Sequence, residues 1–422
     1  MNKLKRELKF FDILCIGVNA IVGSGIFLFP GILMSHMGPA SIFAFFACWV
    51  LLVPVAICFS RLASRYETTG GTYLYARDAF GPWIGFAVGW MAWLVLVLSF
   101  AAVANAISAY LGHFSGFFST WFGVKLVAVT VILALGLLNY RGIKLAARTT
   151  DFFTVAKLIP LAIFVVVGLF FIRKENLTPF APHGLSGFGP AVFLAWFAYQ
   201  GFEGVPVASG EAKSPRKDAP LAVILSLFIC MCLYILIQLV VCGVHPGAAG
   251  SSKPLAEVGS VFLGPWGASM IAVTAAISTL GFTVGTALIT PRYVYALSVD
   301  GYLPKMLSKT HKHFGTPYNA ILISTIVAAI LAVFLDFEKL VDLSNITVGV
   351  QYLATCASAW MLCKAGKNLK GRALSPFFPA FGIGAAIYLM WQAQLGEWLW
   401  TLAAMFAGIA ITLIYRKTVL KK

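Results

Sequence analysis

Three residues in the first long apolar segment, Gly23, Ser24 and Gly25, have the types and spacing that suit an anion site inside a membrane. Two glycines so close together favour unwinding, because glycine is a poor helix former. If the helix restarts at Gly25, its first N–H groups face the break and attract an anion such as a carboxylate. Unwound backbone at membrane depth survives only where it lines a cavity or is buried in protein. The alternative is that these glycines only allow close packing of helices.

A second interruption lies in a later apolar segment, where Gly201, Glu203, Gly204 and Pro206 cluster over residues 195–206. The two interrupted segments are the first and the sixth of the predicted spans. Interrupted segments at corresponding positions of two halves are typical of the binding site of a transporter. The second break therefore favours a binding site over simple packing.

Two charged residues, Lys157 and Glu203, are predicted to lie within the membrane. Lys157 follows Arg148 by nine residues, which places it roughly 13 Å deep along a helix. Burying a lysine at a helix centre costs on the order of 3 kcal/mol. It could reach back to the membrane surface, or it could exchange a proton or replace a coupling cation. Glu203 could act as a proton-linked gate, cap the unwound backbone or pair with a neighbouring helix.

The elements that must position these residues are membrane helices. The chain has 422 residues, of which 60% are hydrophobic and 11% charged, and apolar segments of about 20 residues recur along it. We predict an all-α polytopic membrane protein with twelve spans, over residues 10–35, 39–62, 82–112, 122–140, 149–172, 188–209, 218–242, 262–296, 317–335, 339–363, 375–394 and 397–416.

The distribution of charge gives the expected orientation. Of the 31 lysines and arginines, 25 are predicted on the side of the membrane where the N-terminus lies. Five are predicted on the opposite side, and Lys157 lies within a span. This is the positive-inside pattern, which predicts cytoplasmic N- and C-termini in a cytoplasmic (inner) cell membrane. It argues against a nucleic-acid partner despite the net charge of +16. The eight cysteines lack metal-site spacing and are read as buried apolar residues.

Several short motifs then carry a resemblance to a family. They are VGSGIF at residues 22–27, TGGTYLY at 69–75, GFE at 201–203, GEAKSPRKDAP at 210–220, PRY at 291–293 and DGYLP at 300–304. Because these motifs occur together and in this order, the chain resembles the amino acid–polyamine–organocation superfamily of amino acid permeases. One departure is the Lys213-Ser214-Pro215 sequence, where the family often has Asn before Pro.

The resemblance implies a five-plus-five inverted repeat, like that of a bacterial leucine transporter, with broken helices 1 and 6. The repeats would cover residues 1–172 and 188–363, followed by an extension over residues 375–416. It also implies alternating access, in which spans 1, 2, 6 and 7 rock against a scaffold that includes spans 3, 4, 8 and 9. A lysine at the position of Lys157 resembles a built-in replacement for the sodium ion of sodium-coupled relatives. A carboxylate at the position of Glu203 resembles one seen in several exchangers.

By the same resemblance, the amides of Ser24 and Gly25 would hold a substrate carboxylate. The carbonyls of Ile21, Phe197 and Gln200 would hold its ammonium group. The predicted substrate site therefore consists of Ile21, Gly23, Ser24, Gly25, Phe197, Gln200 and Gly201, with Lys157 and Glu203 as the residues for proton or ion coupling.

The expected function is secondary active transport of an amino acid, coupled to protons and independent of sodium. The apolar surroundings of the two breaks favour neutral, hydrophobic L-amino acids. The alternative is an amino acid/amine or amino acid/amino acid antiporter, with cationic amino acids or polyamines as substrates. The sequence contains no motif for ATP-driven transport or hydrolysis, so we predict no enzyme activity, no cofactor and no metal. The expected partners are the amino acid, a proton and membrane lipid, and either a monomer or a homodimer fits.

Overall fold

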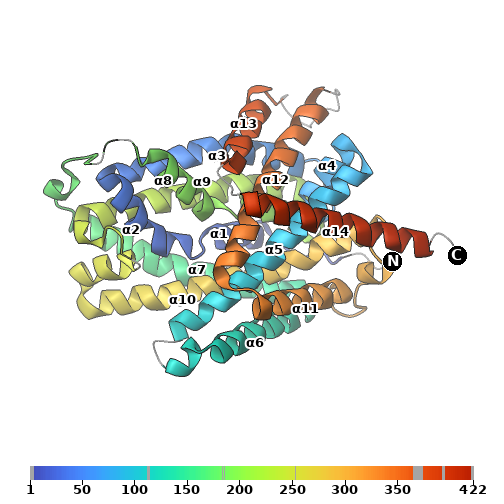
Figure 1. The fold of residues 1–422 in the computed structure, drawn as a ribbon, viewed down its shortest axis with the longest axis horizontal. Helices are drawn as coiled ribbons and strands as arrows, with labels where there is room; N and C mark the ends of the chain where they lie inside the picture. Colours follow the sequence, from blue (N-terminus) through green and yellow to red (C-terminus); the bar gives the residue numbers. More distant parts are fainter. Residues whose placement is uncertain are drawn as a thin grey trace.

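The structure is a computed structural model that describes residues 4–111, 115–182, 184, 186–251, 253–364, 374–391 and 395–419. Within these residues the regular elements are helices without a strand, and one isolated bridge joins Leu8 to Ala212. The helices form an elongated bundle, with α1 (Phe10–Ile21) near its centre (Figure 1).

Fourteen α-helices are present in the described part of the chain. Their bounds are α1 Phe10–Ile21, α2 Gly25–Met37, α3 Ile42–Ala63, α4 Thr72–Phe80, α5 Pro82–Leu111, α6 Trp121–Tyr140, α7 Ile143–Leu169, α8 Phe188–Tyr199, α9 Pro215–Val244, α10 Pro254–Val299, α11 Tyr318–Phe334, α12 Phe337–Lys364, α13 Phe377–Trp391 and α14 Leu395–Val419. Short 3-10 helices connect them: η1 Gly38–Ser41, η2 Gly116–Ser119, η3 Lys174–Leu177, η4 Phe202–Glu211, η5 Pro246–Ala248 and η6 Lys305–Ser308.

Eight helical segments in the described residues are long and apolar enough to cross a membrane, and α1, α11 and α13 are shorter apolar helices. The chain is therefore an all-helical, multi-pass membrane protein. Each predicted span coincides with one helix or with an interrupted pair, namely α1 with α2 and α8 with η4. Residues 112 and 392–394 of the predicted spans lie outside the described residues. The twelve crossings and the inverted repeat stay predictions.

Helix α7 begins at Ile143, earlier than the predicted start at residue 149, because polar residues of its first turns continue the helix beyond the apolar segment. The second half of the sixth span is the 3-10 helix η4 and not an α-helix. Gly204 and Pro206 lie within it, and both residue types disfavour an α-helix.

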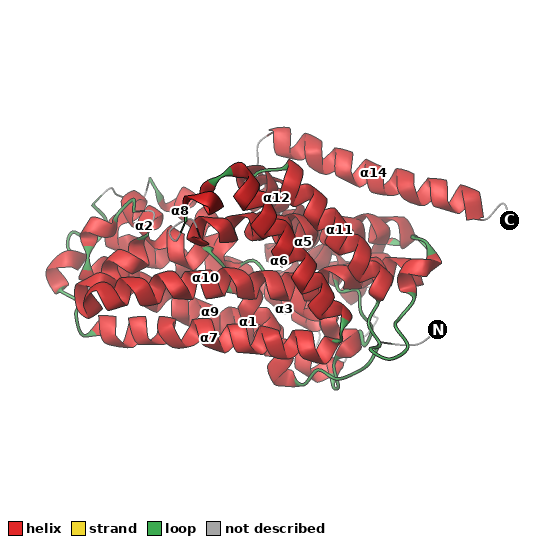
Figure 2. Ribbon diagram, turned by 90° about the horizontal axis from the view of Figure 1, so that it is seen from below, coloured by secondary structure: helices red, strands yellow, loops and turns green. Residues whose placement is uncertain are grey.

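The broken helices lie inside the bundle. Helix α1 packs against α7, α9, α10 and η4, and α5 packs against α10 and α12 across the centre. Helix α14 lies along the outside, where it contacts α5 and α12, as Figure 2 shows. The two interrupted segments are therefore surrounded by continuous helices, which is the setting that unwound backbone requires.

A buried ion pair fixes the end of the second broken segment. The guanidinium of Arg292 on α10 donates two hydrogen bonds to the carboxylate of Glu211, with N–O distances of 2.8 and 3.0 Å. Both side chains are fully buried, and the Asn139 side-chain oxygen accepts a third hydrogen bond of 3.0 Å from Arg292. Such a bidentate pair fixes orientation as well as distance, so η4 is held against α10 and α6.

Candidate functional site

The first break separates α1 from α2 at residues 22–24, as the spacing of the glycines predicts. Helix α2 starts at Gly25, and the Ser24 side chain makes no capping hydrogen bond. The first amides of a helix lack an intrahelical acceptor and carry its positive partial charge. The start of α2 therefore presents uncapped N–H groups beside the break.

The second break lies between α8 and η4, where Gly201 has a φ of +129°. This backbone conformation favours glycine. A Cβ atom on Gly201 would lie 2.4 Å from the carbonyl carbon of Ala20 and 2.5 Å from its oxygen. The two breaks therefore touch each other, and the absence of a side chain at Gly201 permits the contact.

Tyr234 on α9 connects the ends of the two broken helices. Its hydroxyl lies 2.9 Å from the carbonyl oxygen of Ile21 and 3.0 Å from that of Ala198. The single hydroxyl proton is shared between these two acceptors. Because carbonyls freed by unwinding have no water in a bilayer, this hydroxyl satisfies backbone groups at both breaks.

Lys157 is fully buried on α7. Its ammonium donates to the carbonyl oxygens of Asn19 and Val22 at distances of 2.9 and 2.5 Å. Ser278 on α10 donates to the same Val22 carbonyl at 2.9 Å. The alternative in which this lysine reaches back to the membrane surface is therefore wrong, because its ammonium bonds the unwound backbone. The carbonyls at the end of α1 are therefore held by a cationic side chain.

Glu203 caps the second break. One carboxylate oxygen accepts a hydrogen bond of 2.9 Å from the amide of Gly201 and one of 3.0 Å from the hydroxyl of Tyr352 on α12. Two of the expected structural roles, capping unwound backbone and pairing with a neighbouring helix, are thus present in one side chain. A role in proton coupling stays a prediction.

A cavity of about 90 Å³ lies between the two breaks. All seven predicted substrate-site residues line it together with Glu203, whereas Lys157 lies behind the α1 carbonyls and outside the lining. The seven are Ile21, Gly23, Ser24, Gly25, Phe197, Gln200 and Gly201.

Three continuous helices complete the cavity with residues that the sequence did not single out. They include Val95 and Ser99 from α5, Thr286 and Ile289 from α10, and Val348 from α12. None of these five residues is charged or belongs to a glycine-rich break, so no sequence pattern distinguished them. Thr286 gives no signal either, because its hydroxyl donates to the carbonyl of Phe282 in its own helix at 2.9 Å.

The polar groups of the cavity are few. The side-chain amide nitrogen of Gln200 is buried and has no hydrogen-bond partner among the described residues. A buried donor without a partner is costly, so a ligand acceptor would stabilise it. Asn19 lies outside the lining; its side-chain nitrogen donates to the carbonyl of Gly281 on α10, while its side-chain oxygen has no partner among the described residues.

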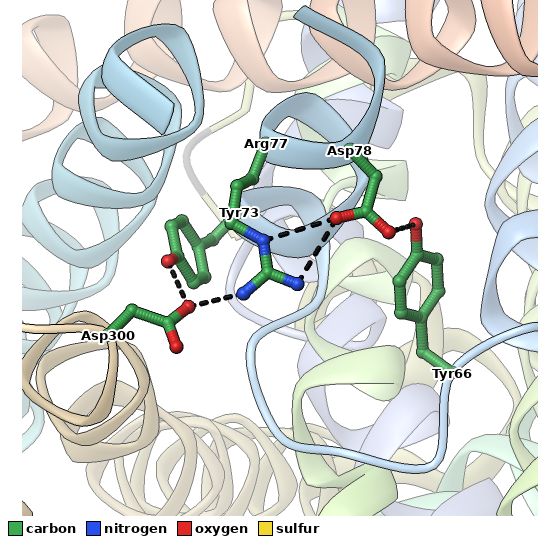
Figure 3. A network of polar contacts seen from close by, with 5 residues as sticks. All are labelled: Tyr66, Tyr73, Arg77, Asp78 and Asp300. Atoms are coloured by element: carbon green, nitrogen blue, oxygen red, sulfur yellow. Dashed lines mark hydrogen bonds and ion pairs between the residues drawn. The ribbon is translucent and has the colours of Figure 1, made fainter. Parts of the chain in front are cut away.

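A second polar network joins α4 to the end of α10, away from the cavity (Figure 3). Arg77 pairs with Asp300 and, at 3.1 Å, with Asp78. Tyr66 donates to Asp78 at 2.8 Å and Tyr73 donates to Asp300. Burial, followed by the adjacent carboxylates, raises the pKa of both phenols, so they stay protonated donors. The network ties the α3–α4 loop to α10.

Comparison with known proteins gives a match to the family model described as "Amino acid permease" over residues 8–415. The chain is 27% identical to the methylthioribose transporter of Bacillus subtilis, covering 99% of this chain and 94% of that protein. It is 27% identical to the branched-chain amino acid permease BcaP of the same organism, with the same coverage. It is 26% identical to the serine/threonine exchanger SteT of that organism, covering 98% of this chain and 97% of that protein.

Replacing Gly201 with Ala tests the contact between the breaks. We expect a large drop in melting temperature for purified Gly201→Ala, because the new methyl group would push the Ala20 backbone away and the positive φ is strained. Gly384→Ala is the matched control, since a Cβ atom there meets nothing within 4 Å. Equal melting temperatures for the two variants would contradict the contact.

Proposed function

The chain belongs to the amino acid permease family, and from that premise we propose that it is a secondary transporter of neutral, hydrophobic L-amino acids, coupled to protons and independent of sodium. The observation that carries the proposal is the meeting of two broken helices around one cavity. Such a site at the middle of a bundle suits alternating access.

The backbone at the breaks suits both charged groups of an amino acid. The uncapped amides at Ser24 and Gly25 favour the carboxylate. The carbonyls of Ile21, Phe197 and Gln200 favour the ammonium group. The Ile21 carbonyl already accepts from Tyr234, but a carbonyl oxygen has two lone pairs and can accept a second hydrogen bond.

The side chains of the cavity support the proposed substrate class. Val95, Ile289 and Val348 offer an apolar surface to a substrate side chain. Glu203 is the candidate partner for a cationic side chain, but its carboxylate already binds Gly201 and Tyr352. A neutral, hydrophobic side chain therefore needs no rearrangement of these hydrogen bonds.

Independence of sodium is supported by Lys157. Its ammonium lies against the carbonyls of Asn19 and Val22, where backbone oxygens would otherwise suit a metal cation. A proton that leaves or enters the Lys157 side chain would change the charge beside the α1 break without any metal ion. Lys157 and Glu203 are the two proposed coupling groups.

The competing proposal is an exchanger of amino acids or amines. Glu203 supports it, because a carboxylate in the cavity lining could hold a cationic substrate if Tyr352 released it. The relative SteT is named a serine/threonine exchanger. Cationic amino acids or polyamines would then be substrates.

The proposed architecture comprises twelve crossings. Ten form two inverted repeats of five, over residues 1–172 and 188–363, and two follow over residues 375–416. Both termini would lie in the cytoplasm of a bacterial cell. The supporting observation is that α1–α2 and α8–η4, the first elements of each repeat, are the broken ones. With α4 on the same side as the N-terminus, the Arg77–Asp300 network would close the cytoplasmic end.

Uptake into liposomes tests the proposal. The purified protein is reconstituted, and labelled leucine, alanine and arginine are offered with and without an inward proton gradient, with and without sodium, and with and without internal unlabelled amino acid. We expect gradient-driven accumulation of leucine in empty vesicles without sodium. Uptake that requires internal amino acid would replace symport with exchange. Uptake of arginine in place of leucine would overturn the substrate class.

Lys157→Ala should make leucine transport insensitive to external pH, because it removes the ionisable group behind the α1 break. Lys125→Ala is the matched control. Lys125 is also buried and also donates to carbonyls, those of Ala332 and Leu335 at the end of α11, but it is remote from the cavity. We expect Lys125→Ala to keep the wild-type pH profile. A pH profile of Lys157→Ala that matches wild type would assign this lysine a purely structural role.

A further inference from the structure

A hollow of about 380 Å³ opens at the end of the bundle where the N-terminal segment lies. We call it the basic hollow, because Lys5, Arg141, Lys144 and Arg148 line it and Glu7 is the one carboxylate in the lining. It belongs to neither the central cavity nor the Arg77–Asp300 network. Four positive charges around one negative charge favour an anionic ligand.

The walls of the basic hollow are held in place by hydrogen bonds. The Lys5 ammonium donates to the His313 carbonyl at 2.6 Å. The Lys5 stem passes over Gly315, where an added Cβ atom would meet it at 2.7 Å. The amide of Glu7 donates to the Glu211 carbonyl at 2.9 Å. These contacts fix the N-terminal segment against residues 313–315 and against Glu211, and Lys5 keeps further N–H groups for a ligand.

Helix α7 contributes its N-terminal end to the basic hollow, with Gly142 as the residue that precedes the helix. The first turn of α7 contains no acidic residue, so no side chain of that turn neutralises its amides. Lys144 and Arg148 lie one turn apart on the same helix and are both exposed. Together these groups suit a phosphate.

An apolar stripe leads away from the basic hollow along α7. It starts at Leu145, which lines the hollow and is 44% exposed, and continues through Phe152, Val155 and Ile159, which are 66%, 42% and 55% exposed. The spacing places these residues on one face of the helix. Figure 2 shows α7 at the outer edge of the bundle. Because α7 is long and apolar enough to cross a membrane, this face meets acyl chains.

We propose that the basic hollow binds an anionic phospholipid, with its phosphate among Lys5, Lys144 and Arg148 and an acyl chain along the α7 stripe. The charge selects the headgroup, and basic pockets beside membrane helices suit such headgroups. The exposed apolar residues along α7 favour a lipid over free phosphate. The inference does not depend on the substrate of the central cavity.

Melting temperature in detergent tests the proposal. The delipidated protein is titrated with dioleoyl phosphatidylglycerol, dioleoyl phosphatidylcholine or inorganic phosphate. The test variant is Lys144→Gln with Arg148→Gln. The control is Lys217→Gln with Lys309→Gln, which removes the same charge from two exposed lysines that are not in the hollow.

We expect phosphatidylglycerol to raise the melting temperature of the wild-type and control proteins, and phosphatidylcholine to raise it much less. The test variant should need at least about tenfold more phosphatidylglycerol for half of the effect, because two charges near the headgroup are lost. An equal response of the test and control variants would overturn the proposal. Stabilisation by inorganic phosphate that phosphatidylglycerol cannot exceed would assign the hollow to a free anion and overturn the lipid.

Discussion

The structure depends on one constraint, that backbone freed inside a bilayer must find partners within the protein. Different groups satisfy the freed backbone at the two breaks. At the end of α1, Lys157 and Ser278 donate to the Val22 carbonyl, and Tyr234 donates to Ile21. At the second break, the carboxylate of Glu203 accepts a hydrogen bond from the Gly201 amide. The donors come from α7, α9 and α10, so the continuous helices around the breaks also hold them open.

At the cavity, the freed carbonyls and the N–H groups differ in their hydrogen-bond partners. The carbonyls at the end of α1 have protein donors, but the amides at the start of α2 have no capping side chain, and the Gln200 side-chain amide has no partner among the described residues. Unfilled donors beside an apolar wall suit a carboxylate with a hydrophobic side chain. A bound carboxylate would complete the hydrogen bonding of the unwound segments.

The sequence predicts the breaks well, because Gly23, Gly25 and Gly201 disfavour a helix wherever they lie. Lys157 is buried beside the first break, and the seven predicted site residues line one cavity. The sequence does not predict the partners. Tyr234 lies in an ordinary apolar helix, and the Glu211–Arg292 pair joins residues 81 positions apart. In the sequence, Lys144 and Arg148 indicate only the orientation of the chain in the membrane. Their position beside Lys5 is seen only in the folded structure. The local tendency of residues to form or break a helix can be read from the sequence, whereas contacts between helices that are distant in the sequence cannot.

Competition against uptake of labelled leucine tests whether the two breaks hold the two charged groups of the substrate. Two truncated analogues are used: 3-methylbutylamine, which lacks the carboxylate, and 4-methylpentanoate, which lacks the ammonium group. We expect each analogue to compete at least about tenfold more weakly than leucine, because each leaves charge-assisted hydrogen bonds at one break unmade. Competition by the amine that equals that of leucine would contradict a carboxylate site at the start of α2.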